Sequence, residues 1–422
     1  MNTTVLEVTQ RIAERSASLR QNYLDRMEHQ ASTGKICQSL SCSNLAHAAT
    51  ACDNRQNDAI SDFTRVNVAI ISAYNDMLSA HQPYQDYPYT IKETLAQQGH
   101  SAQVAGCVPA MGDDLTRGQT GMDMSLYSRD VIAQSVAISL SHNTFDATLL
   151  LGVCDQIAPG QLIGALSFGH LPTAFVPSGP MPTVITDDEQ VIVRQHYVVG
   201  GVTKDVLLTI ACNAYPAPGT FYGTANTNQL VFEAMGLMLP GSAFIPPGTG
   251  LRDVLTQEIA ADITSKIHGA PAYRPLCKVL DEKSLVNGLV ALLASGGSTN
   301  HSIHMIAVAR AAGFILTWDD FDALSQTVPQ LTRVYPNGPA DIHQFHVAGG
   351  VPVLLAALAE RGLLHMDAVP CYGTMADYLK MPELEDGRLV WKSMSGTLNP
   401  EVIADSERVF AITGGLKVLS GN

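Results

Sequence analysis

The chain is poor in charge, and in positive charge most of all. Only 15% of its 422 residues are Asp, Glu, Lys or Arg, and 39 acidic residues against 25 Lys and Arg give a formal net charge of −14. Such a surface repels phosphate backbones and anionic lipid, so we expect neither a nucleic-acid partner nor a membrane partner. An anionic substrate would need local positive groups or a bound metal.

Closely spaced cysteines are also absent. The eight Cys residues include no Cys-x-x-Cys pair, and in a chain of this length they do not form a disulfide scaffold. Any metal cluster would therefore have to collect its thiolates from distant parts of the sequence. The cysteines are Cys37, Cys42, Cys52, Cys107, Cys154, Cys212, Cys277 and Cys371.

Targeting and membrane-spanning segments are missing as well. The N-terminal stretch MNTTVLEVTQRIAERS has the apolar spacing of a helix and not the layout of a signal peptide. The longest apolar candidate, residues 131–153, is interrupted by His142, Asn143 and Asp146. We therefore expect a reduced, cytoplasmic protein.

The sequence does contain a repeated order of apolar strand, polar loop and helix. Parallel strands need crossover helices of this kind, so we predict an α/β fold with a mostly parallel sheet and an N-terminal helical extension. The predicted strands are 66–72, 102–106, 148–153 and 174–176, and the predicted helices between them are 90–99, 122–141 and 160–167.

Three regions are predicted along the chain. Residues 1–65 form the helical extension, which opens with an amphipathic helix over 5–29. Residues 66–400 form the α/β domain. Residues 401–422 read as a connector that would lead to a further domain.

The stretch LLLGVCDQ, residues 149–156, is the chemical centre of the sequence. An apolar strand ends here, and a thiol and a carboxylate follow side by side at Cys154 and Asp155. Ligands of open α/β sheets bind at the carboxyl ends of strands. A thiolate suits an iron–sulfur cluster, and a carboxylate suits a hard divalent cation. The alternative is structural: a buried cysteine beside a capping Asp.

Polar groups also follow the two preceding strands. Asn75, Asp76 and His81 come after the strand at 66–72, where helix capping is the alternative interpretation. Asp113 and Asp114 lie in a Gly-rich loop that would let backbone approach a ligand closely. A plain turn with solvated Asp residues is the alternative there.

A Gly-Gly-Ser-Thr-Asn turn opens a predicted helix in the second half of the chain. Ser298, Thr299 and Asn300 would offer hydroxyls and backbone N–H groups to an anion such as phosphate or carboxylate. Ordinary capping of the helix by Ser298 or Thr299 is the alternative.

Taken together, several stretches resemble the iron–sulfur sugar-acid and dihydroxy-acid dehydratases, and within them the branch acting on 6-phosphogluconate in the Entner–Doudoroff pathway. They follow the order of that family over nearly the whole chain. They are SNLAHAATAC (43–52), SAYNDMLSAHQPY (72–84), QVAG and VPAM (103–111), GVCD (152–155), ALSFGHLP (165–172), FVPSGPM (175–181), FYGTANTNQ (221–229), ASGGSTNH (294–301) and YPNGPADI (335–342).

The resemblance implies a hydro-lyase that removes water from a sugar acid with the help of a 4Fe–4S cluster and Mg²⁺. Cys154 would be a cluster ligand, while Asp113 and Asp155 would bind the cation. Cys42 is the candidate for a second cluster ligand, and Cys212 or Cys107 for a third. The loop with Asn75, Asp76 and His81, and the turn with Ser298, Thr299 and Asn300, would line the substrate pocket of a homodimer.

The chain departs from the family pattern at four places. Gln156 stands where the family has a lysine that becomes a metal ligand once carbamylated. Thr220 runs directly into Phe221, so the family's cluster Cys of that loop is missing. Gly112 replaces the Cys of the phosphogluconate branch, and the chain ends at Asn422, before the family's C-terminal domain with its Ser base.

These departures leave three functions open. The first is a 6-phosphogluconate dehydratase, which we expect to be inactive as this chain alone. The second is a non-catalytic family member that binds sugar acids or Mg²⁺. The third is a dehydratase for a dihydroxy acid or another sugar acid.

Overall fold

A parallel sheet organises the first half of the molecule. In the computed structural model, which describes the chain except residues 34–39, 53, 63, 181–186, 213–218, 406 and 422, this sheet has four strands in the order β2-β1-β3-β4. Ile70 of β1 pairs with Val104 on one side and Leu149 on the other. The strands are β1 (Asn67–Ser72), β2 (Ser101–Cys107), β3 (Ala147–Leu151) and β4 (Thr173–Phe175).

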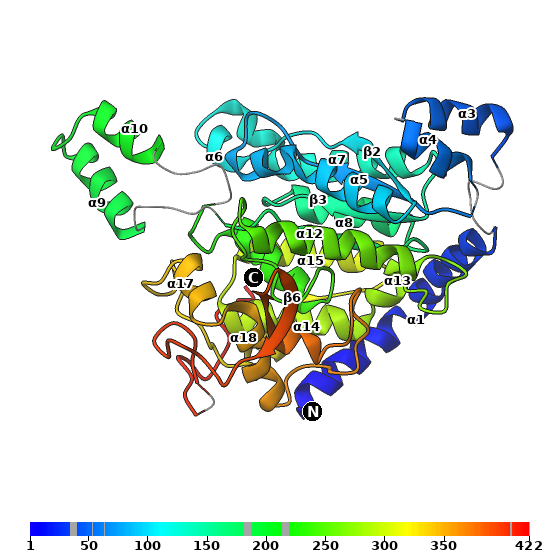
Figure 1. The fold of residues 1–422 in the computed structure, drawn as a ribbon. Helices are drawn as coiled ribbons and strands as arrows, with labels where there is room; N and C mark the ends of the chain where they lie inside the picture. The colour runs from blue at the N-terminus through cyan, green and yellow to red at the C-terminus, as the bar shows by residue number, and fades with distance from the viewer. Residues whose placement is uncertain are drawn as a thin grey trace.

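Helices connect these strands and cover the sheet. The connections are α5 (Tyr87–Gln97), α7 (Ser125–Leu140) and α8 (Ile157–Leu166). The helices α7 and α8 pack against each other, and α5 packs against α12 (Gly250–Ile263) (Figure 1). The chain runs from β1 to β2 and then returns to the other side of β1. The strand order therefore reverses between β1 and β3, where open α/β sheets bind ligands.

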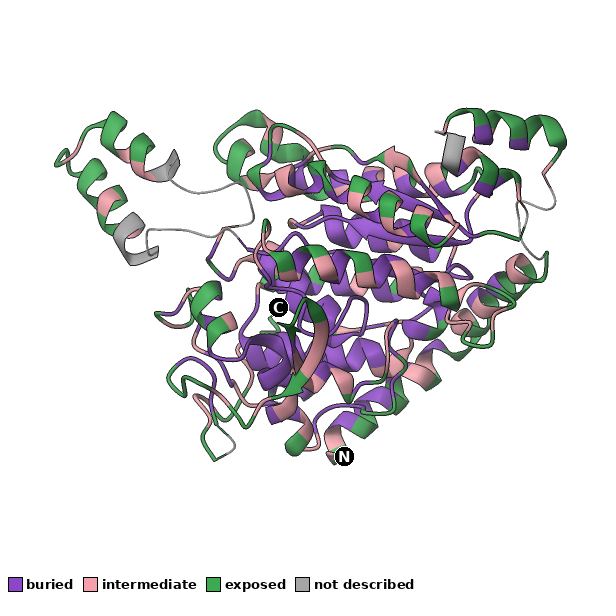
Figure 2. Ribbon diagram, viewed as in Figure 1, coloured by how far each residue is buried: buried purple, intermediate pink, exposed green. Residues whose placement is uncertain are grey.

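The second half is mostly helical and is built around α14 (Glu282–Ser295). Nearly all of α14 is buried, and α11 (Thr224–Ala234) and α1 (Thr3–Ser32) pack on it. Arg11 and Arg15 of α1 both pair with the buried Asp320 at the start of α16 (Trp318–Ser325). Figure 2 shows the resulting continuous buried interior beneath the sheet.

The remaining elements are shorter or lie at the edges. In the first half they are α3 (Cys42–Thr50), α4 (Asn54–Ser61), η1 (Ser79–Gln85), α6 (Asp113–Thr116), η2 (Thr120–Met124), α9 (Asp187–Val198) and α10 (Lys204–Cys212). In the second half they are η3 (Thr264–Lys266), α13 (Leu276–Val279), α15 (Thr299–Ala311), α17 (Ile342–Val347), α18 (Gly350–Glu360), η4 (Asp377–Leu379), β5 (Lys380–Glu385) and β6 (Arg388–Ser393).

The predicted α/β class, the parallel sheet and the N-terminal helix are confirmed. The antiparallel hairpin β5–β6 was not predicted, nor was α12. The helix α11 begins at Thr224, within the stretch FYGTANTNQ. Among the described residues no helix is both long and apolar enough to cross a membrane.

Two glycines let α8 lie close to α7. A Cβ added at Gly160 would come within 2.7 Å of the Arg129 carbonyl oxygen, and one at Gly164 within 2.5 Å of the Ala133 carbonyl oxygen. Because backbone atoms cannot swing aside as a side chain can, α7 and α8 pack at a distance that only glycine allows.

We therefore expect Gly164→Ala to lower the free energy of unfolding by about 1–3 kcal/mol, since the added methyl group overpacks the contact. Urea unfolding followed by circular dichroism measures this. Gly250→Ala is the matched control, because the nearest atom there, Leu384 Cδ1, lies 3.8 Å away. Equal effects of the two substitutions would contradict the close-packing argument.

Candidate functional site

A cavity of about 570 Å³ opens at the carboxyl ends of β1, β2 and β3. Three loops line it: residues 77–80 after β1, 112–117 after β2, and Cys154 with Asp155 after β3. The opposite wall comes from the N-terminus of α11 and from Ser298 before α15. The reversal of strand order between β1 and β3 thus places the loops of the first half against two helix N-termini of the second.

Cys154 turns the chain from β3 toward α8 in a left-handed backbone conformation. Its φ of 69° is unusual for a residue with a side chain. Asn228 of α11 holds this turn, because its Nδ2 donates to the carbonyl oxygen of Cys154 at 2.7 Å. Burial raises the pKa of the Cys154 thiol, and the carboxylates of Asp155, Asp114 and Asp113 raise it further. Strained backbone of this kind concentrates at functional sites.

Asp113 and Asp155 form a carboxylate pair in the cavity. Burial raises the pKa of Asp155 to about 7, and the adjacent Asp113, with which it shares a hydrogen bond, adds to this shift. Thr224 donates a hydrogen bond to Asp155 and acts in the opposite direction. Two carboxylates this close favour either a shared proton or a cation between them.

Gln156 and Ser125 hold Asp113 in place from behind. The Nε2 of Gln156 donates to Ser125 Oγ at 2.7 Å, and Ser125 Oγ donates to Asp113 Oδ1 at 2.6 Å. The same Nε2 lies 3.5 Å from Asp113 Oδ2. The Oε1 of Gln156 is buried and has no hydrogen-bond partner, which is uncommon for a buried acceptor.

The other wall offers groups that suit an anion. The hydroxyls of Thr224 and Ser298 lie 2.8 Å apart and join the N-termini of α11 and α15. Among the described residues that line the cavity, Arg117 is the one with a cationic side chain. Its guanidinium is largely exposed and lies 3.6 Å from Asp114. The cavity therefore has an acidic wall and a wall of hydroxyls and helix N-termini.

The predicted residues after β1 support the loop and do not line the cavity. Asn75 accepts hydrogen bonds from the backbone N–H groups of Met77 and Leu78. Asp76 accepts from the Tyr74 hydroxyl. None of the three predicted residues, Asn75, Asp76 and His81, is among the cavity-lining residues.

His81 is fully buried behind Cys154. Its Nε2 lies 3.2 Å from the carbonyl oxygen of Val153, and burial lowers the pKa of its imidazole to about 4. His81 is therefore neutral near pH 7 and supports the backbone just before Cys154.

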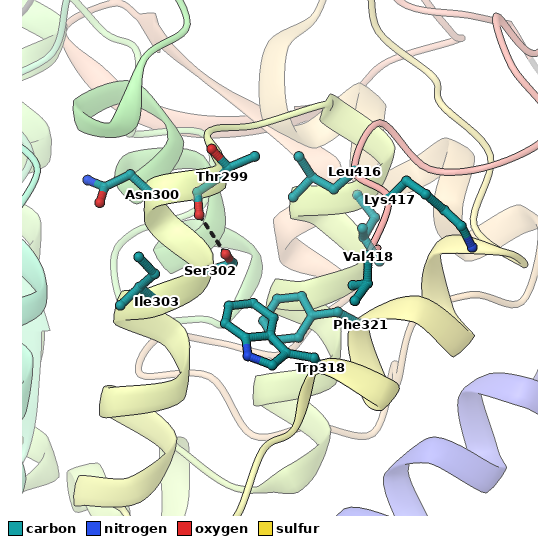
Figure 3. A pocket seen from close by; sticks show the side chains of 10 residues that line it. Thr299, Asn300, Ser302, Ile303, Trp318, Phe321, Leu416, Lys417 and Val418 are labelled. Atoms are coloured by element: carbon teal, nitrogen blue, oxygen red, sulfur yellow. Dashed lines mark hydrogen bonds between the residues drawn. The ribbon is translucent and has the colours of Figure 1, made fainter. Parts of the chain in front are cut away.

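The predicted Ser-Thr-Asn turn is divided between two cavities. Ser298 lines the acidic one, while Thr299 and Asn300 line a second cavity of about 520 Å³. Figure 3 shows this second cavity, where Trp318 and Phe321 face the C-terminal residues Leu416 to Val418. Its walls are mainly apolar, with Ile303 and Leu293 beside the two aromatic rings.

Two of the predicted cluster ligands, Cys154 and Cys42, lie apart in the structure. Cys154 lies in the acidic cavity, whereas Cys42 is exposed on α3, far from α6 and the cavity loops (Figure 1). The side chain of Cys212 lies outside the described residues. Within the described part of the chain, no group of three or more His, Cys, Asp and Glu side chains is arranged to hold a metal ion.

The residues that the sequence reasoning missed are Arg117, Ser125, Thr224 and Asn228. Thr224 and Asn228 belong to the stretch FYGTANTNQ, which is part of the family resemblance, but neither residue was predicted to have a role. Asn228 also contacts His301, whose Nδ1 lies 2.5 Å from Asn228 Oδ1. Ser125 carries no local signal, because its role depends on the packing of α7 beside α8.

Comparisons with known proteins agree with the resemblance. Residues 65–378 match the family described as Dihydroxy-acid/6-phosphogluconate dehydratase N-terminal. Phosphogluconate dehydratase of Pseudomonas aeruginosa is 50% identical over 426 residues, which cover 100% of this chain and 70% of the relative. That of Escherichia coli K12 is 51% identical over 427 residues, with coverages of 100% and 71%. Dihydroxy-acid dehydratase of Metallosphaera sedula is 30% identical over 373 residues, 86% of this chain and 64% of the relative.

The strained turn yields a prediction about stability. A side chain at φ 69° costs about 1 kcal/mol relative to glycine. The free energy of unfolding of Cys154→Gly, measured by urea unfolding, should therefore be about 1 kcal/mol higher than that of Cys154→Ala. Both variants lack the thiol, so their difference reports the backbone alone. Equal stabilities would contradict the left-handed turn.

Proposed function

Since the chain belongs to the dihydroxy-acid/6-phosphogluconate dehydratase family, we propose that it acts on 6-phosphogluconate as a hydro-lyase of the Entner–Doudoroff pathway. Water leaves from C2 and C3 of the sugar acid, and the resulting enol becomes 2-keto-3-deoxy-6-phosphogluconate. The observation that carries this proposal is identity of about half to phosphogluconate dehydratases across the whole chain.

The acidic wall fits a Mg²⁺ ion. Mg²⁺ is often held by roughly one or two carboxylates while it keeps several waters, so the pair Asp113 and Asp155 is sufficient although the described residues contain no larger preformed ligand group. Burial raises the pKa of Asp155 and the nearby Asp113 raises it further, and a cation between the two carboxylates would offset both effects. When bound, Mg²⁺ supplies Lewis-acid stabilisation of negative charge that develops on the substrate.

The described residues do not fit a 4Fe–4S cluster. Such a cluster usually needs about three or four thiolates, and Cys154 is the one described Cys that lines the cavity. We therefore assign no step of the reaction to a cluster.

The chain's own residues bind and orient the substrate in this proposal. The phosphate is the strongest anion of 6-phosphogluconate. The N-termini of α11 and α15 favour it from one wall, and Arg117, beside Asp114 on the acidic wall, adds a cationic side chain. Ser125 and Gln156 keep Asp113 directed at the cavity. Asn228 keeps Cys154 and Asp155 in their turn.

A non-catalytic binding protein for sugar acids is the second candidate. The observations that favour it are the neutral Gln156 beside Asp113 and the single described thiol at the cavity. A dihydroxy-acid substrate is the third candidate, supported by the more distant relative of that name. The three candidate functions differ in whether the substrate is turned over and in whether the substrate must carry a phosphate.

Calorimetry and a 2-keto-acid assay with Mg²⁺ test the proposal. We expect 6-phosphogluconate to bind this chain more tightly than gluconate, and to be converted to a 2-keto acid when the C-terminal domain that the family resemblance implies is supplied with it. Binding without turnover would favour the non-catalytic candidate, and turnover of a dihydroxy acid alone would favour the third.

Arg117→Met gives a sharper test of the substrate. A charge-assisted bond to phosphate is worth about 1.5–3 kcal/mol, so the dissociation constant for 6-phosphogluconate should rise at least about tenfold. Gluconate, which has no phosphate, is the control ligand and should bind the variant and the wild type equally. An equal loss for both ligands would contradict the placement of the phosphate.

A further inference from the structure

A further pocket, of about 390 Å³, is distinct from the two cavities described above and shares no lining residue with them. The chain as a whole is acidic, with 39 acidic residues against 25 Lys and Arg. In this pocket the balance is reversed, because two of the described lining residues carry a guanidinium group and none carries a carboxylate. The lining residues are Gln330, Arg333, Asn337, Arg408, Val409 and Phe410.

Backbone pairing between two distant segments builds this pocket. The N–H of Gln330 donates to the carbonyl oxygen of Ala411 at 3.0 Å, and the N–H of Phe410 donates to the carbonyl oxygen of Gln330 at 3.0 Å. The N–H of Arg333 donates to the carbonyl oxygen of Val402 at 2.9 Å. These bonds hold the C-terminal part of the chain beside the segment after α16, and so place Arg333 and Phe410 on one pocket.

The Phe410 ring orients both guanidinium groups. The Cζ of Arg333 lies 5.6 Å from the centre of this ring, and the Cζ of Arg408 lies 5.3 Å from it. Such cation–π contacts engage the flat face of a guanidinium and leave its N–H donors, which lie in its plane, for other partners. Two positive groups are thus held at one pocket in spite of their mutual repulsion.

The carboxylates nearby balance only part of this charge. Arg408 donates to Glu401 at 2.7 Å, which lowers the pKa of Glu401, and the charge of Arg333 lowers it further. Asp405 also attracts Arg408, while Arg361 donates to the backbone oxygens of both residues. Among the described residues, the guanidinium of Arg333 has no hydrogen bond or ion pair. Its N–H donors are therefore available to an anion in the pocket.

We propose that this pocket is a binding site for a phosphate group. A phosphate dianion balances the charge of two guanidinium groups, and its oxygens match the paired N–H donors of arginine. The side-chain nitrogens of Gln330 and Asn337 each donate one N–H to a backbone oxygen and have a second N–H for the ligand. The volume of the pocket also leaves room for the organic part of a phosphate ester. The inference goes beyond the proposed function, because it needs no substrate in the acidic cavity.

Arginine modification by phenylglyoxal, mapped on proteolytic peptides by mass spectrometry, tests the proposal on the wild-type chain. The added ligands are inorganic phosphate, 6-phosphogluconate and gluconate. We expect the two phosphate compounds at saturation to slow the modification of Arg333 and Arg408 at least about tenfold, because a guanidinium bound to phosphate is shielded from the reagent. Gluconate should leave both rates unchanged. Arg388 is the control site, because it is exposed on β6 and lies outside the pocket.

The comparison of ligands identifies the source of the phosphate group. Protection by both phosphate compounds supports recognition of the group itself. Protection by 6-phosphogluconate alone assigns the site to a phosphate ester, and protection by inorganic phosphate alone assigns it to the free ion. Unchanged modification of Arg333 and Arg408 with both compounds would overturn the proposal, as would equal protection by gluconate.

The variants Arg333→Met and Arg408→Met each leave one guanidinium in the pocket to report on binding. We expect the ligand concentration that half-protects the remaining arginine to rise at least about tenfold, since a charge-assisted hydrogen bond is lost. Arg388→Met removes the same charge from the exposed hairpin and should change nothing. Circular dichroism melts verify that each variant is folded. Wild-type protection in both pocket variants would contradict the assignment.

Arg117→Met separates this site from the acidic cavity. Inorganic phosphate should protect Arg333 and Arg408 in this variant as it does in the wild type, because Arg117 lines the other cavity. Protection that is lost in Arg117→Met would place the phosphate in the acidic cavity and overturn the inference. A failed dehydratase assay with intact protection would reject the proposed function and leave this inference standing.

Discussion

The turn between β3 and α8 is the constraint on which the site depends. A parallel strand must be left at its carboxyl end, and here the chain leaves β3 through a left-handed residue that carries a thiol. His81 from the loop after β1 supports the residue before the turn, and Asn228 from α11 supports its carbonyl oxygens. His81 from the first half and Asn228 from the second half thus contact the backbone on either side of this turn, and these contacts fix the position of Asp155.

Electrostatics explain why a strongly acidic chain can still serve an anionic substrate. The carboxylates of the cavity are gathered on the sheet side, and hydroxyls and helix N-termini face them from α11 and α15. Such a division repels an anion until a cation neutralises one wall. Under the proposed function, a cation on the carboxylates makes the whole cavity complementary to a sugar acid, so we expect metal binding and substrate binding to be coupled by charge.

Much of the fold follows from local pattern in the sequence, and less of the site does. The runs that became β1 and β3 are short, apolar and followed by polar loops, so their strands and their functional ends were predictable. Cys154, Asp155 and Asp113 follow such strands, Ser298 was predicted from the turn that opens α15, and all four lie on one cavity. His81 was identified as a substrate residue, but tertiary packing buries it behind the strand end. Ser125 and Asn228 could not be found, because their partners are distant in sequence.

The close packing of α7 and α8 also has a consequence for ion selectivity. Ser125 begins α7 and Gln156 caps α8, so the hydrogen bonds that hold Asp113 rest on a helix pair that glycines lock together. A carboxylate carried on such a support cannot retreat to make room for a larger ion. Rigid oxygen sites discriminate by ionic radius. For the Mg²⁺ site proposed above, we therefore expect the helix packing to favour Mg²⁺ over Ca²⁺ through backbone geometry well below the cavity surface.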